Sequence, residues 1–227
     1  MPDGADPKSP SQGEYLPAMR FRALTPAFDA VVHVAMREKK FRPALIEQVD
    51  PRPGHRILDL GAGTGSLAIM AKQRQPLCDV TGLDADPEIL ELARRKATEA
   101  QVDVRLDEGL STELPYGEGS FDRVMSTLFF HHLSSTDKRA TLAEVGRVLR
   151  PGGELHIGDY ARAADPLQAL LSWQIRIFDG FERTRENFAG ELPKSLAAAG
   201  FTDIREGRRL RTVFGTLGLL SGTRSAR

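Results

Sequence analysis

The stretch Ile57-Leu58-Asp59-Leu60-Gly61-Ala62-Gly63-Thr64-Gly65 joins a short apolar run to a glycine-rich turn through an acidic residue. Residues 66–73 then carry the spacing of a helix. Glycine lets the backbone take positive φ and approach a ligand closely, and the first N–H groups of a helix are free to bind one. The stretch therefore predicts a strand, a ligand-binding turn and a helix in succession.

Outward from this stretch, strand and helix patterns alternate along the chain. The predicted strands are 56–60, 79–83, 102–106, 121–127, 154–159, 202–209 and 212–220. The predicted helices are 25–49, 66–73, 87–100, 136–150, 167–182 and 187–199. This alternation predicts an α/β fold, a doubly wound and mostly parallel seven-stranded sheet with helices on both faces. Almost no chain separates the last two strands, so we expect them to form an antiparallel pair.

Length and charge limit the kind of protein. The chain has 227 residues, and its 31 basic residues balance its 31 acidic residues. We expect a flexible tail over 1–20 and a single domain over 21–227, with a helical lid inserted at about 161–186. A balanced charge argues against a nucleic-acid partner. The sequence shows neither a signal-peptide pattern nor an apolar run of about 18 residues, which predicts a cytoplasmic protein without stable membrane insertion. We expect it to be a monomer or a homodimer.

The glycine spacing separates two classes of nucleotide ligand. A dinucleotide turn follows the pattern G-x-G-x-x-G, but Ser66 stands here where the third glycine belongs. Asp59 would repel a pyrophosphate and would suit a ligand that carries a cationic group. Asp84 ends the next predicted strand, where a carboxylate can accept hydrogen bonds from a ribose diol. Asp86 is expected only to cap the helix that starts at Pro87.

Four segments in this order resemble class I S-adenosylmethionine-dependent methyltransferases. They are Asp59-Leu-Gly-Ala-Gly-Thr-Gly65, Gly82-Leu-Asp-Ala-Asp86, Leu114-Pro-Tyr116 with Ser120-Phe-Asp-Arg-Val124, and Arg147-Val-Leu-Arg-Pro-Gly-Gly153. Each segment is common, but the ordered set is specific, and the similarity extends over roughly residues 25–220. Within the family, the chain is most similar to the small-molecule branch that includes the ubiquinone/menaquinone methyltransferases.

The resemblance implies S-adenosylmethionine as the cofactor, S-adenosylhomocysteine as its product, and a set of binding residues. This set is Asp59, Gly61, Ala62, Gly63, Gly65, Asp84, Ala85, Gly109, Leu110, Ser111, Thr127 and Leu128. Asp59 would lie near the ammonium group and Asp84 at the ribose, with Ala85 beside the adenine. Leu110 departs from the family, where an aspartate frequently accepts from the adenine amine. Either a backbone group or Glu108 replaces that acceptor, or packing alone holds the adenine.

The methyl-donor side is implied at residues 127–128, after the fourth predicted strand. Methyltransferases that modify planar exocyclic amines have Asn/Asp-Pro-Pro-aromatic here, whereas this chain has Thr127-Leu128-Phe129-Phe130. The difference argues against a base-modifying enzyme.

Three residues near the same edge are candidates for catalysis: His132, His131 and Tyr160. A histidine near its ordinary pKa is a ready base at pH 7, although both could instead be ordinary loop residues. Side chains alternate in an extended segment, so we expect at most one of the two histidines to face the site. Tyr160 could orient the substrate or contact the sulfonium, or only pack. No metal site is expected, because no third ligand accompanies the histidines.

The sequence predicts transfer of a methyl group from S-adenosylmethionine to a small, partly apolar acceptor. Trp173 and Phe181 in the inserted segment could cover such an acceptor or only pack their own helix. A non-catalytic S-adenosylmethionine-binding protein and an NAD-dependent oxidoreductase are the alternatives. The stretch from Asp203 onward holds six arginines against two acidic residues, which fits either an anionic lipid surface or a solvated strand edge.

Overall fold

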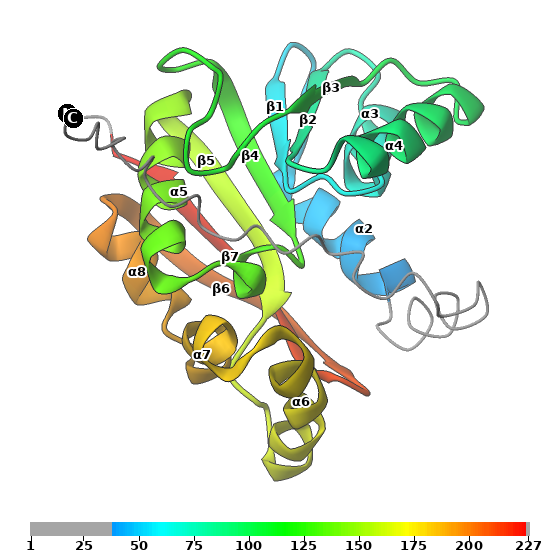
Figure 1. Ribbon diagram of the computed structural model, residues 1–227. Helices are drawn as coiled ribbons and strands as arrows, with labels where there is room; N and C mark the ends of the chain where they lie inside the picture. The colour runs from blue at the N-terminus through cyan, green and yellow to red at the C-terminus, as the bar shows by residue number, and fades with distance from the viewer. Residues whose placement is uncertain (1–37, 226–227) are drawn as a thin grey trace, which may run out of the picture.

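The computed structural model describes residues 38–225, which fold around one seven-stranded sheet (Figure 1). The strands are β1 (Arg56–Leu60), β2 (Asp79–Asp84), β3 (Arg105–Glu108), β4 (Phe121–Thr127), β5 (Leu149–Tyr160), β6 (Phe201–Thr212) and β7 (Gly215–Arg224). Their order is β3-β2-β1-β4-β5-β7-β6. The first five are parallel to one another, and β7 is antiparallel to both β5 and β6. The predicted fold class is confirmed.

The register of the parallel strands places their carboxyl ends at one edge of the sheet. Leu60 at the end of β1 pairs with Leu83 in β2, and Thr127 at the end of β4 pairs with Gly158 in β5. The turns that follow β1, β2, β4 and β5 therefore leave the sheet at the same edge. This is the edge where open α/β sheets bind their ligands.

Helices cover both faces of the sheet. They are α2 (Glu38–Val49), α3 (Ser66–Arg74), α4 (Pro87–Glu99), α5 (Ser135–Val148), α6 (Pro166–Asp179), α7 (Phe181–Ala189) and α8 (Leu192–Ala198), with a 3-10 turn η1 (Phe130–His132). One buried cluster joins α2 and α3 to Ile57 of β1, and a second joins α5 and α8 to Leu58. Adjacent residues of one strand thus pack into the two cores on opposite faces of the sheet. Among residues 38–225, no helix has the length and apolar character needed to cross a membrane.

Two boundary predictions concern helix α4 and the N-terminal region. The Asp86 carboxylate accepts hydrogen bonds from the N–H groups of Glu88 and Ile89, and Pro87 begins the helix, so the predicted cap is confirmed. The predicted tail, 1–20, and residues 25–37 of the first predicted helix lie outside the described residues.

Predicted boundaries are wrong in several places. The connection between the last two strands lies at 213–214 rather than at 210–211, because β6 continues to Thr212. The predicted helices 167–182 and 187–199 are three helices, because Gly180 at φ 91° and Gly190 at φ 73° interrupt them. Strand β3 starts at Arg105 rather than at residue 102. Strand β5 starts at Leu149, directly after α5. Its pairing with β4 shifts register between Leu149 and Glu154, so residues 150–153, which include the Pro-Gly-Gly segment, lie in this irregularity.

Candidate functional site

The glycine-rich turn is fastened to the end of β2 by backbone hydrogen bonds. The N–H groups of Gly61 and Ala62 donate to the Leu83 carbonyl at 2.9 and 3.0 Å. Gly61, Gly63 and Gly65 all have positive φ, at 69°, 52° and 71°. Only glycine adopts these angles without strain, so the turn owes its shape to these three residues, and α3 begins immediately after it.

Asp84 is the side chain that joins the turn to β2. One carboxylate oxygen accepts the Gly63 N–H at 2.8 Å, and the other accepts the Asp86 N–H at 3.1 Å. Partial burial raises the pKa of Asp84, while these N–H donors oppose the rise. A carboxylate oxygen can accept more than one hydrogen bond, so Asp84 can still accept from a ligand.

Asp59 is a buried carboxylate beneath the same turn. Its Oδ2 accepts the Ala68 N–H at 3.0 Å. Its Oδ1 is buried and accepts no hydrogen bond from any of residues 38–225. Burial raises the pKa of Asp59 to about 7, although the Ala68 N–H lowers it. A buried oxygen without a donor is costly, and it marks a place where a cationic or N–H-bearing group would be stabilised.

The ring of Phe129 lies directly on Gly61. A Cβ added to Gly61 would lie 2.4 Å from Cδ2 of that ring, so only glycine allows this contact. At Gly63, in contrast, an added Cβ would meet only Ile89 Cδ1, at 3.9 Å. The turn is therefore packed at its first glycine and open at its second.

Gly61→Ala is expected to destabilise the protein by about 2–4 kcal/mol, because the methyl group both strains the backbone and displaces the Phe129 ring. Chemical denaturation measures this loss. Gly63→Ala, which shares the strain but has space, is the matched control and should cost about 1 kcal/mol. In a Phe129→Ala background, Gly61→Ala should cost less stability than it does in the parent protein. An equal penalty in both backgrounds would show that the ring contact contributes nothing.

The segment predicted at the adenine edge lies beside the end of β2. The Gly109 N–H donates to the Asp84 carbonyl at 3.0 Å, and Ala85 is partly exposed next to it. Leu110 is 53% exposed. The Ser111 hydroxyl is within 2.8 Å of the Thr141 hydroxyl in a buried pair, so it is directed toward α5.

Residues 127–128 lie where β4 ends, at the same edge. Leu128 has φ 53°, an unusual angle for a leucine, and its N–H donates to the Gly158 carbonyl at 2.8 Å. The Thr127 hydroxyl is buried and has no hydrogen-bond partner among the described residues. The structure therefore brings the turn, Asp84, residues 109–111 and the end of β4 to one edge of the sheet.

The two histidines are not in an extended segment, so the alternation on which the prediction about them rested does not apply. They lie in the 3-10 turn η1, and their ring centroids are 3.9 Å apart. His131 is buried, and its Nδ1 lies 2.7 Å from Asp159 Oδ1, while its backbone N–H donates to Asp159 Oδ2 at 3.1 Å. His132 keeps contact with solvent, while desolvation on its packed side and the neighbouring His131 lower its pKa.

Tyr160 is buried at the end of β5 between two other rings. Its ring meets His131 edge-on at 4.9 Å and stacks on Phe188 of α7 at 5.1 Å. The inserted helices thus reach the predicted catalytic residues through Phe188. The sequence offered no role for Phe129 or for Asp159 as the partner of His131, because both contacts join residues that local patterns do not relate.

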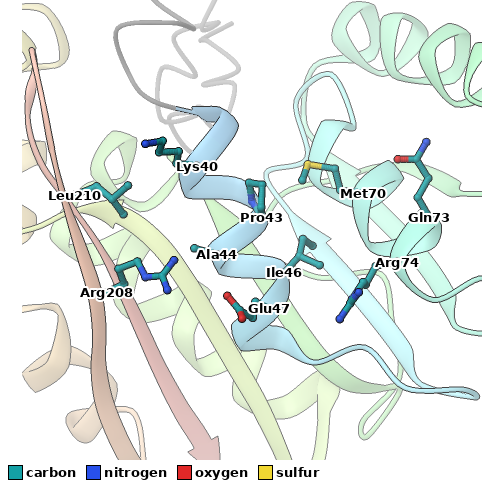
Figure 2. A pocket seen from close by; sticks show the side chains of 10 residues that line it. All are labelled: Lys40, Pro43, Ala44, Ile46, Glu47, Met70, Gln73, Arg74, Arg208 and Leu210. Atoms are coloured by element: carbon teal, nitrogen blue, oxygen red, sulfur yellow. The ribbon is translucent and has the colours of Figure 1, made fainter.

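A groove elsewhere on the molecule contains none of the predicted site residues. It lies between α2, α3 and β6, and Figure 2 shows Lys40, Arg74 and Arg208 around it together with Glu47. The predicted residues lie instead at the carboxyl edge of the strands, so we assign this groove no part in the chemistry.

Comparison with known proteins gives matches over most of the chain. Residues 57–153 match the model of a family described as a methyltransferase domain. The demethylmenaquinone methyltransferase of Deinococcus radiodurans is 34% identical over 149 residues, which are 65% of this chain and 61% of that protein. The chain therefore spans less than two thirds of that relative.

A second relative matches over a greater length. The demethylmenaquinone methyltransferase of Listeria monocytogenes is 31% identical over 208 residues, covering 82% of this chain and 86% of that protein. Among solved structures, the S-adenosylmethionine-dependent methyltransferase SibL superposes with a TM-score of 0.71 at 25% identity, covering 88% of this chain and 60% of that one.

Proposed function

The chain belongs to the S-adenosylmethionine-dependent methyltransferase family, and we propose that it transfers a methyl group from S-adenosylmethionine to a small, partly apolar acceptor. The relatives' names point to quinone-like rings as one acceptor class. The single cysteine and the balanced charge support a cytoplasmic enzyme that works without a nucleic-acid partner, as a monomer or homodimer.

The observation that carries the proposal is the unpartnered Oδ1 of Asp59. A buried carboxylate with a free oxygen is a poor structural element, but it is a good receptor for an ammonium group. The methionine part of S-adenosylmethionine carries such a group. The orphaned oxygen and the glycine turn above it therefore fit the cofactor that the family uses.

The remaining predicted residues fit the same ligand. The open backbone at Gly63 leaves room for close approach, and Asp84 retains acceptor capacity for the ribose hydroxyls. Gly61, Ala62 and Gly65 shape the turn, while Ala85, residues 109–111 and residues 127–128 would line the adenine and the methyl-donor side. Leu110 supports packing, rather than a side-chain hydrogen bond, at the adenine.

When bound, S-adenosylmethionine supplies a methyl group on a positively charged sulfur, which is already electrophilic. The protein then has mainly to align the acceptor and exclude water. His132 is the better placed of the two histidines to accept an acceptor proton, because it reaches solvent. Its lowered pKa of about 3 keeps it neutral at pH 7 but makes it a weak base, so it suits only an acceptor whose proton is readily lost. His131 is held by Asp159 and serves as a positioning residue, and Tyr160 would form a wall of the acceptor site.

Calorimetric titration tests the proposal. The purified full chain should bind S-adenosylmethionine and S-adenosylhomocysteine with micromolar affinity and should not bind NAD. Asp84→Ala is expected to weaken binding by about 1.5–3 kcal/mol, because it removes a charged hydrogen-bond partner.

Asp86→Ala is the matched control, since it removes a carboxylate two residues away that only caps α4. It should lower stability by about 1 kcal/mol and leave the affinity unchanged. An unchanged affinity in Asp84→Ala would disprove the ribose assignment, and NAD binding would overturn the proposed function itself.

A further inference from the structure

Helix α6 has its apolar face turned toward solvent. Leu167, Leu170, Trp173 and Ile177 are 62%, 66%, 53% and 63% exposed, and they recur at intervals of three and four residues. Such spacing places them on one face of the helix. A surface helix of a globular protein normally buries that face.

The opposite face of α6 packs on the protein through polar and apolar side chains together, with Ile175 against the core. Gln168 and Ser172 are 5% and 3% exposed. The Gln168 side chain donates to the Thr212 carbonyl at 3.2 Å and accepts from the Thr216 hydroxyl at 3.4 Å. These hydrogen bonds hold α6 on the β6–β7 hairpin with the exposed apolar row turned outward, so rotating the helix would leave buried polar groups unpaired.

The apolar surface continues beyond the helix. Phe181 at the start of α7 is 44% exposed, and its ring meets Trp173 edge-on at 5.5 Å. Val213 at the hairpin tip is 48% exposed, and its carbonyl accepts from the Gln174 side chain at 3.3 Å. We call these six residues the α6 patch: Leu167, Leu170, Trp173, Ile177, Phe181 and Val213. In Figure 1, α6 and the hairpin tip project together beyond the end of the sheet.

Basic side chains lie beside the patch. Arg185 is exposed one helical turn after Phe181 in α7, and Arg211 is exposed two residues before Val213, where it also pairs with Asp165. Arg176 lies 4.9 Å from the centroid of the Phe181 ring. Exposed leucine and tryptophan beside arginines are typical of helices that lie in the interface of an anionic bilayer.

We propose that the α6 patch docks the protein on the surface of a membrane that contains anionic lipids. The apolar side chains would enter the acyl boundary, and the arginines would meet the negative headgroups. The patch belongs to the segment that follows Tyr160 directly in the chain, and Phe188 of α7 in the same segment stacks on Tyr160. This inference goes beyond methyl transfer, and its test needs neither cofactor nor acceptor.

Trp173 makes the test direct, because it is the only tryptophan in the chain. Its emission is measured with the full chain and with vesicles of phosphatidylcholine alone or of equal parts phosphatidylcholine and phosphatidylglycerol. We expect a blue shift and quenching by brominated acyl chains with the mixed vesicles, and much weaker effects with phosphatidylcholine alone. High salt should reduce the binding.

Two sets of variants locate the contact. Leu167→Ser/Leu170→Ser/Ile177→Ser should lower the partition coefficient by at least about tenfold, because three apolar side chains no longer enter the bilayer. Leu77→Ser/Leu92→Ser is the matched control, since these leucines are 71% and 37% exposed away from the patch, and it should bind as the parent does. Arg185→Gln/Arg211→Gln should remove the preference for anionic vesicles.

The competing occupant is a second copy of this chain. Dimerisation through the patch would shift the Trp173 emission as protein concentration rises without vesicles, and sedimentation would show a dimer that the triple serine variant abolishes. That result, or the absence of any shift with mixed vesicles, would overturn the proposal. Normal cofactor binding alongside either result would leave the proposed function intact.

Discussion

Asp59→Asn is expected to stabilise the ligand-free protein above pH 7. The same substitution should weaken S-adenosylmethionine binding by about two orders of magnitude, because the buried ammonium group of the cofactor loses its carboxylate partner. The Asp59 carboxyl is fully buried and one of its oxygens has no donor among the described residues. The unpartnered oxygen that fits the cofactor therefore lowers the stability of the protein when no cofactor is bound.

The sign of the pH effect follows from the raised pKa. Burial moves the pKa of Asp59 from 3.8 to about 7. Between these values the folded protein binds more protons than the unfolded chain, so its stability falls as pH rises from about 4 to about 7. Asparagine removes this dependence. Its amide places two N–H donors at the position of the unpartnered oxygen, which offsets part of the gain, so we expect a net gain of about 1–3 kcal/mol at pH 8 and none at pH 5.

Urea denaturation at both pH values and calorimetry with S-adenosylmethionine measure the two effects. Asp79→Asn is the control, because Asp79 is exposed at the opposite end of β2, and it should change neither quantity. A variant at Asp59 that binds the cofactor normally would show that the carboxylate does not meet the ammonium group. Equal stability differences at pH 5 and pH 8 would show that Asp59 is ionised throughout.

The sequence was most informative where the pattern is local. Strands β1 and β4 have the predicted bounds, because their apolar runs are bordered by turns and buried on both faces. Strand β3 was misplaced, because it lies at the edge of the sheet and none of its four residues is fully buried. The inserted segment was divided wrongly, since Gly180 and Gly190 act through backbone angles that composition does not reveal.

The candidate site was predictable in its position but not in its contacts. The turn and Asp84 lie where their strands end, which spacing alone predicts. The placement of Phe129 on Gly61 and the pairing of His131 with Asp159 depend on chain segments 68 and 28 residues apart. Periodicity likewise predicted a helix near residues 167–182, but not that its apolar face points outward.

Asp159→Ala is expected to destabilise the protein by about 3–5 kcal/mol, the cost of removing one partner from a buried pair. Asp159 is 3% exposed and accepts the His131 ring and backbone N–H and the Tyr160 N–H. Alanine would leave two backbone donors and a ring nitrogen without this acceptor. Asp159→Asn, which preserves the shape of the side chain but not its charge, should lower the free energy of unfolding by less than Asp159→Ala does.

The pH dependence separates this pair from a simple packing contact. Burial alone would raise the pKa of Asp159, but His131 and the Tyr160 N–H overcome it and lower the pKa. The pair's contribution is therefore present above about pH 4 and is lost as pH falls through the lowered value. In urea denaturation, parent and Asp159→Ala should converge at acid pH. Glu91→Ala, which breaks an exposed pair with Arg94, should cost at most about 0.5 kcal/mol. A similarly small loss in Asp159→Ala would show that the pair is not a structural anchor of the site.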